Sequence, residues 1–292
     1  MEHQPRFGLL RSLGYGWRIA HEAFSTFNAS DGWAIASHIA LSALMALFPF
    51  LIVVTALAGF FGSRELADEA ARILLEAWPE EVAEPIALEI HGVLTSARGD
   101  VLTIGVAFAI YFASSGVESL RIALNRSYAV TEQRNWLVLR LESIAYVLVG
   151  AVALLVFSFL VVLAPLIWTT ILIYLPHLAP LGVWLTFARF AVAAVVLIAA
   201  LIVVHLWLPA GRRRLRDIWP GILATLVLWL VSGAIFGRYL AEYAFNYFTM
   251  YAGLASAVIA LFFLYITASI FIYGGDLNAA VLRTRAAGQG GG

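Results

Sequence analysis

The sequence predicts an all-α polytopic membrane protein, a bundle of about six transmembrane helices with amphipathic helices at the membrane surfaces. Of its 292 residues, 62% are hydrophobic and only 12% are charged, whereas soluble domains are nearer half apolar and a quarter charged. Apolar runs long enough to cross ~30 Å of hydrocarbon recur along the chain. Arginines gather in alternate loops between these runs. A chain with so little polar surface needs lipid to cover it.

The spans are the apolar runs of roughly 20 residues or more. Several exceed the minimum length and are expected to tilt or to project beyond the bilayer. Pro49 and Pro165 lie inside spans and should kink them. We assign residues 1–31 to an amphipathic interfacial segment, 32–285 to the membrane domain and 286–292 to a disordered tail. The six runs are residues 33–61, 101–118, 141–170, 181–208, 218–240 and 251–282.

The arginines predict the orientation of these spans. All 18 basic residues are Arg, and thirteen of them lie before the first span, in the second and fourth loops or after the last span. The first loop on the opposite side holds Arg64, Arg72 and Arg98, and the third loop holds none. The positive-inside rule therefore places both termini in the cytoplasm, which agrees with an even number of spans.

Two segments outside the spans are amphipathic. In the first 30 residues apolar side chains fall three or four apart, while Arg11 and Arg18 share another side. This pattern fits either a helix in the cytoplasmic interface or one packed on the bundle. The first outside loop, residues 62–100, is acidic and should form two short helices broken at Pro79 and Pro85. We interpret it as a solvated external cap, with a site for a cation or a cationic partner as the alternative.

Polar side chains at membrane depth define the candidate site. Each costs several kcal/mol unless it is paired or hydrated, so each is a functional candidate. Four of them share one helical face of the second span, and the others come from the sixth and first spans. The alternative is that these groups only tie helix ends together or reach toward water. The predicted pocket, in the cytoplasmic half of the bundle, consists of Ser114, Glu118, Arg121, Asn125, Asp276 and His38.

Three charged residues lie toward the outer side. Arg238 and Glu242 are four residues apart and should pair on one helix. Arg189, about eight residues into its span, would reach either outer-leaflet phosphates or Glu242 on another helix. The sequence does not choose between these two arrangements.

Several classes of chemistry are not expected. The chain has no Cys, which excludes disulfides, thiol catalysis and thiolate metal sites. Its six His are scattered singly, so we expect no metal and no cofactor, and we interpret His38 as a hydrogen-bonded core residue. The formal net charge is zero, which gives no case for nucleic-acid binding. Small residues abound in the spans and would permit a homo-oligomer, although abundance alone does not define an interface.

Three stretches of the chain resemble the BrkB/YihY family of bacterial inner-membrane proteins, historically labelled ribonuclease BN. The resemblance spans roughly residues 20–285. The family usually carries Glu where this chain has Asp276, a departure that keeps the carboxylate. The stretches are Ala36–Gly62 with Leu47-Phe48-Pro49; Ser114–Leu120 followed by Ala123-Leu124-Asn125-Arg126 and Tyr128; and Leu208-Pro209, Asp217, Pro220-Gly221, Tyr251, Gly253 and Gly275–Ala280.

The resemblance implies six transmembrane helices in a bacterial inner membrane and little chemistry, because the family has no settled function. It links members to serum resistance and to export of envelope lipids or lipopolysaccharide. Together with the polar residues of the predicted pocket, this favours a non-enzymatic protein that binds or moves an amphipathic envelope substrate. Membrane lipids are the expected partners, in particular an anionic lipid or a lipid-linked glycan. Arg121 would meet an anionic head group, held in place by Glu118. The alternatives are a proton-coupled or small-solute transporter and a membrane scaffold, with ribonuclease activity ranked last.

Overall fold

The computed structural model describes residues 6–61, 99–158, 160, 164–251 and 254–289. These residues form helices, and no strand occurs within the described ranges. The all-α fold class is therefore confirmed. The elements are α1 (Arg6–Ala29), α2 (Gly32–Phe61), α5 (Gly99–Ser127), α6 (Trp136–Ser158), α7 (Ala164–Tyr174), the 3-10 helix η2 (Pro176–Leu181), α8 (Gly182–Trp207), α9 (Leu215–Tyr251) and α10 (Ala255–Gln289).

The chain divides into two compact units, which are described separately. The first unit contains residues Met1–Leu41, Gly116–Asn135 and Ile202–Gly292. The second contains Ser42–Ser115 and Trp136–Leu201. The first unit therefore holds α1, α9 and α10 whole, together with the C-terminal part of α5.

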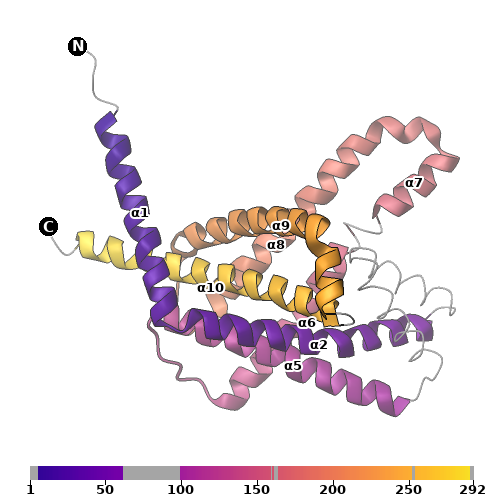
Figure 1. Ribbon diagram of the computed structural model, residues 1–292, viewed down its shortest axis with the longest axis horizontal. Coiled ribbons are helices and arrows are strands. Elements are labelled where there is room, and N and C mark those ends of the chain that lie inside the picture. The colour runs from indigo at the N-terminus through magenta and orange to yellow at the C-terminus, as the bar shows by residue number, and fades with distance from the viewer. Residues whose placement is uncertain (1–5, 62–98, 159, 161–163, 252–253, 290–292) are drawn as a thin grey trace. The chain divides into compact units, whose positions relative to one another are not determined.

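The first unit is built on the pair α9 and α10, which lie side by side, with α1 crossing α10 (Figure 1). Where α1 and α10 meet, Ile19 and Ala23 pack against Ala280 and Val281. Ala23 and Ala280 are fully buried. Small residues on both helices allow this close contact, because no long side chain holds the backbones apart.

Glycines bring α9 and α10 closest together. A Cβ atom on Gly221 would fall on the carbonyl oxygen of Gly274 and within 2.5 Å of Nδ2 of Asn278. A Cβ atom on Gly274 would in turn collide with the hydroxyl of Thr225. The backbone N–H of Gly221 donates to Oδ1 of Asn278 at 2.6 Å, in a buried position. This crossing fixes the register of the two longest helices.

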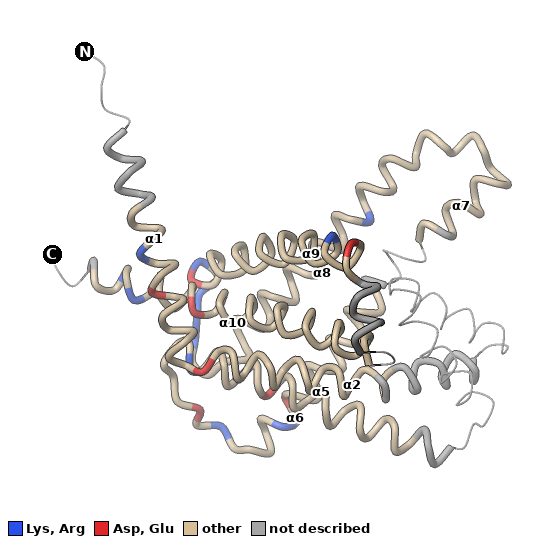
Figure 2. The backbone as a smooth tube through the Cα atoms, viewed as in Figure 1, with Lys and Arg blue, Asp and Glu red and all other residues tan. Residues whose placement is uncertain are grey.

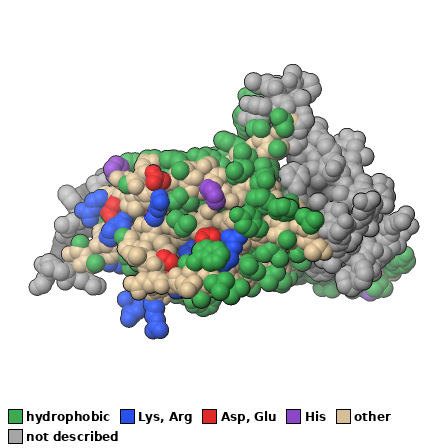
Figure 3. Space-filling view, turned by 90° about the horizontal axis from the view of Figure 1, so that it is seen from below, with side chains coloured by type: hydrophobic (Ala, Val, Ile, Leu, Met, Phe, Trp, Pro, Cys, Tyr) green, Lys and Arg blue, Asp and Glu red, His purple; other side chains and the backbone are tan. Residues whose placement is uncertain are grey.

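The second unit holds α6, α7, η2 and most of α8. Its side chains are largely apolar and exposed, as Val152, Val183 and Trp184 illustrate with exposed fractions of 61%, 77% and 74%. Hydrophobic side chains also cover large areas of the face shown in Figure 3. Such surfaces are typical of helices that face lipid.

Five of the helices are long and apolar enough to cross a membrane, which supports five of the six expected spans. They are α5, α6, α8 with η2, α9 and α10. The other expected span, residues 33–61, lies in α2, and the stretch Gly32–Leu47 of that helix is also apolar. Helix α9 carries no charged residue between Asp217 and Arg238, and α10 carries none before Asp276, so both helices are drawn mostly in the colour of uncharged residues in Figure 2.

Helix bounds differ from the expected ones because apolar runs and helices end for different reasons. The expected span at residues 141–170 contains parts of α6 and α7, and the residues between these two helices lie largely outside the described ranges. Pro165 stands in the first turn of α7, where its missing N–H costs nothing. Helix α5 continues past Glu118 to Ser127, since charged residues end a hydrophobic run but not a helix. Helix α10 runs to Gln289, into residues we assigned to the tail.

Other sequence predictions meet the structure only in part. The expected amphipathic helix near the N-terminus is α1, which buries Ile19 and Phe27 and leaves Trp17 and Phe24 exposed. This two-sided pattern agrees with both interpretations, because one face packs on α10 and the other is free for the interface. Pro49 lies inside α2 as expected. The acidic loop at residues 62–98 lies outside the described residues, and its cap and cation-site interpretations stay predictions.

Candidate functional site

Helix α5 carries four of the six residues of the predicted pocket. Ser114, Arg121 and Asn125 are buried, with exposed fractions of 0%, 2% and 8%, and Glu118 is half-buried. The hydroxyl of Ser114 donates to the carbonyl of Tyr111 on its own helix at 3.0 Å. The shared helical face predicted from the spacing is therefore a buried face, and it places one guanidinium inside the protein.

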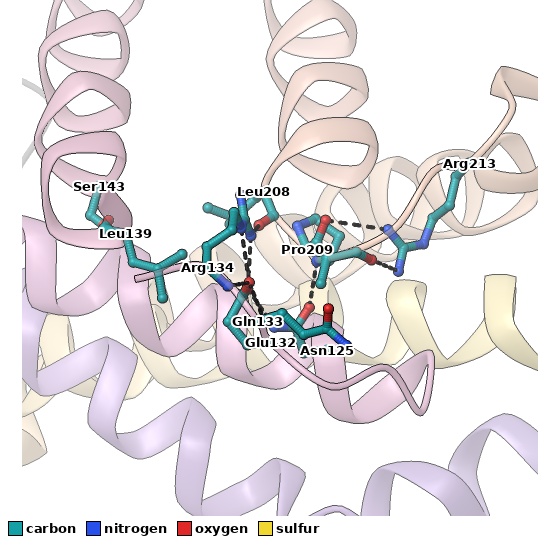
Figure 4. Close-up of polar contacts among 10 residues, drawn as sticks. Asn125, Glu132, Gln133, Arg134, Leu139, Ser143, Leu208, Pro209 and Arg213 are labelled. Carbon is teal, nitrogen blue, oxygen red and sulfur yellow. Dashed lines mark hydrogen bonds and ion pairs between the residues drawn. The ribbon is translucent and has the colours of Figure 1, made fainter. Parts of the chain in front are cut away.

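Asn125 joins the end of α5 to the turn that follows α8. Its Oδ1 accepts the backbone N–H of Ala210 at 2.7 Å, and its Nδ2 donates to Glu132 at 3.2 Å (Figure 4). Both ends of the amide thus have protein partners. Asn125 supports the turn, and its amide gives less support to the ligand-binding role that we expected.

Glu132 and Arg134 complete this connection. Arg134 donates from Nε and Nη2 to the two carboxylate oxygens of Glu132 at 2.8 and 2.7 Å, and Nη2 also reaches the carbonyl of Leu208 at 3.1 Å (Figure 4). These hydrogen bonds from Arg134, with a smaller one from Asn125, lower the pKa of Glu132 to about 2 despite its partial burial. The pair therefore stays ionised over the ordinary pH range.

Arg213 and Tyr128 form a second contact at the same turn. The Arg213 guanidinium lies 3.9 Å from the centre of the Tyr128 ring and donates to the carbonyl of Ala210 at 2.9 Å. Burial raises the pKa of Tyr128 to about 12, and burial also lowers the pKa of Arg213. The phenol therefore stays neutral and the ring shields the guanidinium from solvent.

Asp276 differs from these residues. It is fully buried in the middle of α10, and among the described residues neither carboxylate oxygen has a hydrogen-bond donor. Ser127 faces it from α5, but the Ser127 hydroxyl already donates to the carbonyl of Ala123 at 3.1 Å. The next residue back, Gly275, lies against Leu124, so α5 and α10 meet here with no room for a larger side chain.

His38 and the three outer residues each make a contact of their own. The Nδ1 atom of His38 and the Ser119 hydroxyl lie 2.8 Å apart, joining α2 to α5. His38 is hydrogen-bonded as expected, but it is exposed, so its placement in a core was wrong. Arg238 and Glu242 pair at 3.5 Å with exposed side chains, which confirms that pair. The Arg189 guanidinium lies 4.8 Å from the ring of Phe190, and its wider role stays a prediction.

Two further observations bear on chemistry. Among the described residues, no group of three or more His, Asp or Glu side chains is placed to hold a metal ion. Charges of both signs intermingle on the face shown in Figure 3 and do not form one basic field.

Sequence reasoning missed several residues of this region. Glu132, Arg134 and Arg213 all lie outside the spans: Arg134 and Arg213 were counted only among the loop arginines, and Glu132 was not singled out. The contact of Arg134 with Leu208 spans 74 residues and that of Arg213 with Tyr128 spans 85, so no local spacing pointed to these two contacts. The Pro220-Gly221 pair was a usable signal, because a glycine within a helix often marks a close approach of two backbones.

A model of the family described as "Virulence factor BrkB" matches residues 23–291. The "Putative ribonuclease-like protein YfkH" of Bacillus subtilis (strain 168) is 25% identical over 268 residues, covering 88% of this chain and 93% of the relative. The "UPF0761 membrane protein RC1_0578" of Rhodospirillum centenum (strain ATCC 51521 / SW) is 26% identical over 277 residues, covering 92% of this chain. This chain spans 58% of that second relative. No solved structure matches.

Proposed function

Since the chain belongs to the virulence factor BrkB family of membrane proteins, we propose that it binds or moves an amphipathic envelope substrate. The substrate class is an anionic lipid or a lipid-linked glycan. The observation that carries the proposal is the burial of Arg121 on α5 and of Asp276 on α10, both inside helices apolar enough to span a membrane. The protein acts in this proposal as a binding or transport protein and not as an enzyme.

Arg121 is the residue that suits an anionic head group. A guanidinium keeps its charge when buried and offers five N–H donors in a fixed plane that matches phosphate oxygens. At 2% exposure it is sealed in this conformation, so a substrate would reach it only when the helices around α5 move. In this proposal Glu118, three residues earlier on the same helix, orients it.

Helix α1 supports a membrane role at the surface. Its exposed Trp17 and Phe24 lie on the side away from α10, and Arg18 is exposed beside them. Aromatic and basic side chains together favour the head-group layer of a bilayer. In this proposal the protein spans a bacterial inner membrane with both termini in the cytoplasm, as the arginine distribution predicts.

Native mass spectrometry of the detergent-purified full chain tests the substrate class. We expect wild type to retain a specific anionic lipid or glycolipid that Arg121→Ala loses. Arg238→Ala is the matched control, because that Arg is exposed and paired on the surface of α9. Equal retention of bulk lipid by all three proteins would contradict the proposal.

A second candidate, proton-coupled transport of a small solute, is favoured by one observation. The Asp276 carboxylate is buried without a donor among the described residues, as in sites that exchange a proton or a cation. Flux into proteoliposomes driven by a pH gradient separates this candidate from the first. In both cases we expect the purified protein, free of contaminating nuclease, not to cleave RNA.

A further inference from the structure

We infer that Asp276 is a proton-binding site that α1 closes through the ion pair between Glu22 and Arg283. The inference deepens the transport role proposed above and rests on it for its biological use. The site itself can be detected without any transport assay.

Helix α1 covers the stripe of α10 on which Asp276 lies. Three residues of α10 at helical spacing from Asp276 contact α1. The Tyr273 hydroxyl donates to the carbonyl of Ala20 at 3.3 Å, and Ala280 packs on Ile19 and Ala23. Arg283, one turn farther, donates to Glu22 at 2.8 Å. These contacts belong to the crossing of α1 over α10 that Figure 1 shows, and they lie on both sides of Asp276 along α10.

The neighbours of Asp276 leave its carboxyl without a donor. Ser127 faces it, yet that hydroxyl gives its single hydrogen to Ala123 and can only accept from the carboxyl. An ionised carboxylate buried in this way would be uncompensated, which is costly inside a protein. A carboxylic acid, in contrast, can donate its own O–H to the Ser127 oxygen. The geometry therefore suits the protonated form.

The other titratable and charged groups do not supply a donor in its place. Tyr128 after α5 and Tyr273 on α10 interact with Asp276 electrostatically, and so does Arg283. Arg213 and Asp217 lie beyond Tyr128 and act on its phenol. The Tyr273 hydroxyl donates to α1, and Arg283 donates to α1 and, through Nη1, to the backbone carbonyl of Ser127 at 3.5 Å.

Arg283 is the group that can change the state of Asp276. It lies two turns after Asp276 on the same face of α10, and helical side chains lean toward the N-terminus. In this conformation Glu22 of α1 accepts from Nε at 2.8 Å and Thr26 from Nη2 at 2.9 Å, while Nη1 donates to the backbone carbonyl of Ser127 at 3.5 Å and not to the carboxylate of Asp276. The ion pair is 43% and 38% exposed, so it can open at the surface while the carboxyl stays buried. Release of Arg283 toward Asp276 would expel the proton.

Infrared spectroscopy of the full chain in liposomes at neutral pH tests the site, because a carboxylic acid and a carboxylate absorb at different frequencies. We expect a carboxylic-acid carbonyl band in wild type, lost in Asp276→Asn and retained at a shifted frequency in Asp276→Glu. The Glu variant keeps the test valid if Asn folds poorly. Wild type and Asp276→Asn spectra without a difference in this band would overturn the inference.

The closing role of α1 is tested by Glu22→Gln in the same experiment. Without its charged partner, Arg283 should turn to Asp276, and the carboxylic-acid band should be lost or reduced. Asp31→Asn, which breaks the similar pair with Arg126 at 3.1 Å, should leave the band unchanged. An unchanged band in Glu22→Gln would refute the gate. If the bands behave as expected but neither lipid binding nor flux is found, the site stands and the proposed function fails.

Discussion

Two buried polar groups of the first unit, Asn125 and Asp276, differ in how their hydrogen-bonding capacity is met. Both the oxygen and the nitrogen of the Asn125 amide have hydrogen-bond partners. The hydrogen bonds continue from Asn125 to Glu132, from Glu132 to Arg134 and from Arg134 to the carbonyl of Leu208. Asp276 is more deeply buried and carries a charge when ionised, yet no described residue donates to it. The first arrangement stabilises a turn.

The contrast separates structural from functional polarity within one unit. Buried polar groups in native proteins are nearly all hydrogen-bonded, and those that are not cluster where a protein binds or changes state. We therefore attribute a role in the stability of the fold to the hydrogen bonds of Asn125, Glu132 and Arg134. Asp276 and the ion pair above it are better explained as a site. The following variants test that division, in order of expected effect.

The largest effect is expected from Gly221→Ala, because both regions depend on the crossing of α9 and α10. The added Cβ would collide with the backbone of Gly274, which cannot rotate away. We expect a loss at the upper end of about 1–3 kcal/mol in unfolding free energy. Gly237→Ala on the same helix meets nothing within 4 Å and should be neutral or slightly stabilising. Thermal unfolding in detergent compares the two variants. Equal melting temperatures would contradict the close approach of α9 and α10 at Gly221.

Asn125→Ala should come next. It leaves the backbone N–H of Ala210 without an acceptor and removes one donor from Glu132. The expected loss is about 1–3 kcal/mol, the usual cost of an unsatisfied buried group. The exposed Gln133→Ala in the same loop is the control and should change little. If unfolding shows both variants to be equally stable, the amide is not the structural link described here.

The Glu132 and Arg134 pair predicts a pH dependence of stability. The folded pKa of Glu132, about 2, lies below its ordinary value of 4.5. A lowered carboxyl pKa stabilises the folded state above pH 4.5, and that contribution is lost as pH falls toward 2. Wild type should therefore be more stable than Glu132→Gln at neutral pH, with the difference shrinking below pH 4.5. A constant difference across that window would show that the charge is not involved.

The smallest effect is expected from Glu242→Gln, which breaks the exposed pair with Arg238. Exposed pairs four residues apart on a helix contribute about 0.3–0.5 kcal/mol. Urea or thermal unfolding should barely detect the change. A loss of several kcal/mol would instead place the pair in hydrocarbon, where an unpaired Arg is far more costly.

Much of the architecture was predictable because each span is encoded locally. Apolar length alone located α8 and α10, and a four-residue spacing predicted the Arg238 and Glu242 pair. The spacing of Ser114 to Asn125 also predicted a buried face on α5. These features depend on residues within one or two turns of each other.

What could not be predicted depends on contacts between distant segments. The acceptor for Ala210 is 85 residues earlier in the chain, and Arg283 meets Glu22 across 261 residues. The predicted pocket grouped Asn125 with Asp276 because both lie near the same ends of their spans. The depth of a residue in the membrane does not show which neighbouring helix its side chain faces. Asn125 and Asp276 are predicted at similar depth, but the residues around them differ.

The most direct test of whether Asp276 is functional and not structural is to measure both the melting temperature and the function of Asp276→Asn. If Asp276 is a site, the Asn variant should melt at or above the wild-type temperature, because no structural partner is lost. It should also lose the lipid retention or pH-driven flux of wild type. A melting temperature lowered as far as that of Asn125→Ala, with function retained in the folded fraction, would contradict the account and make Asp276 a structural residue.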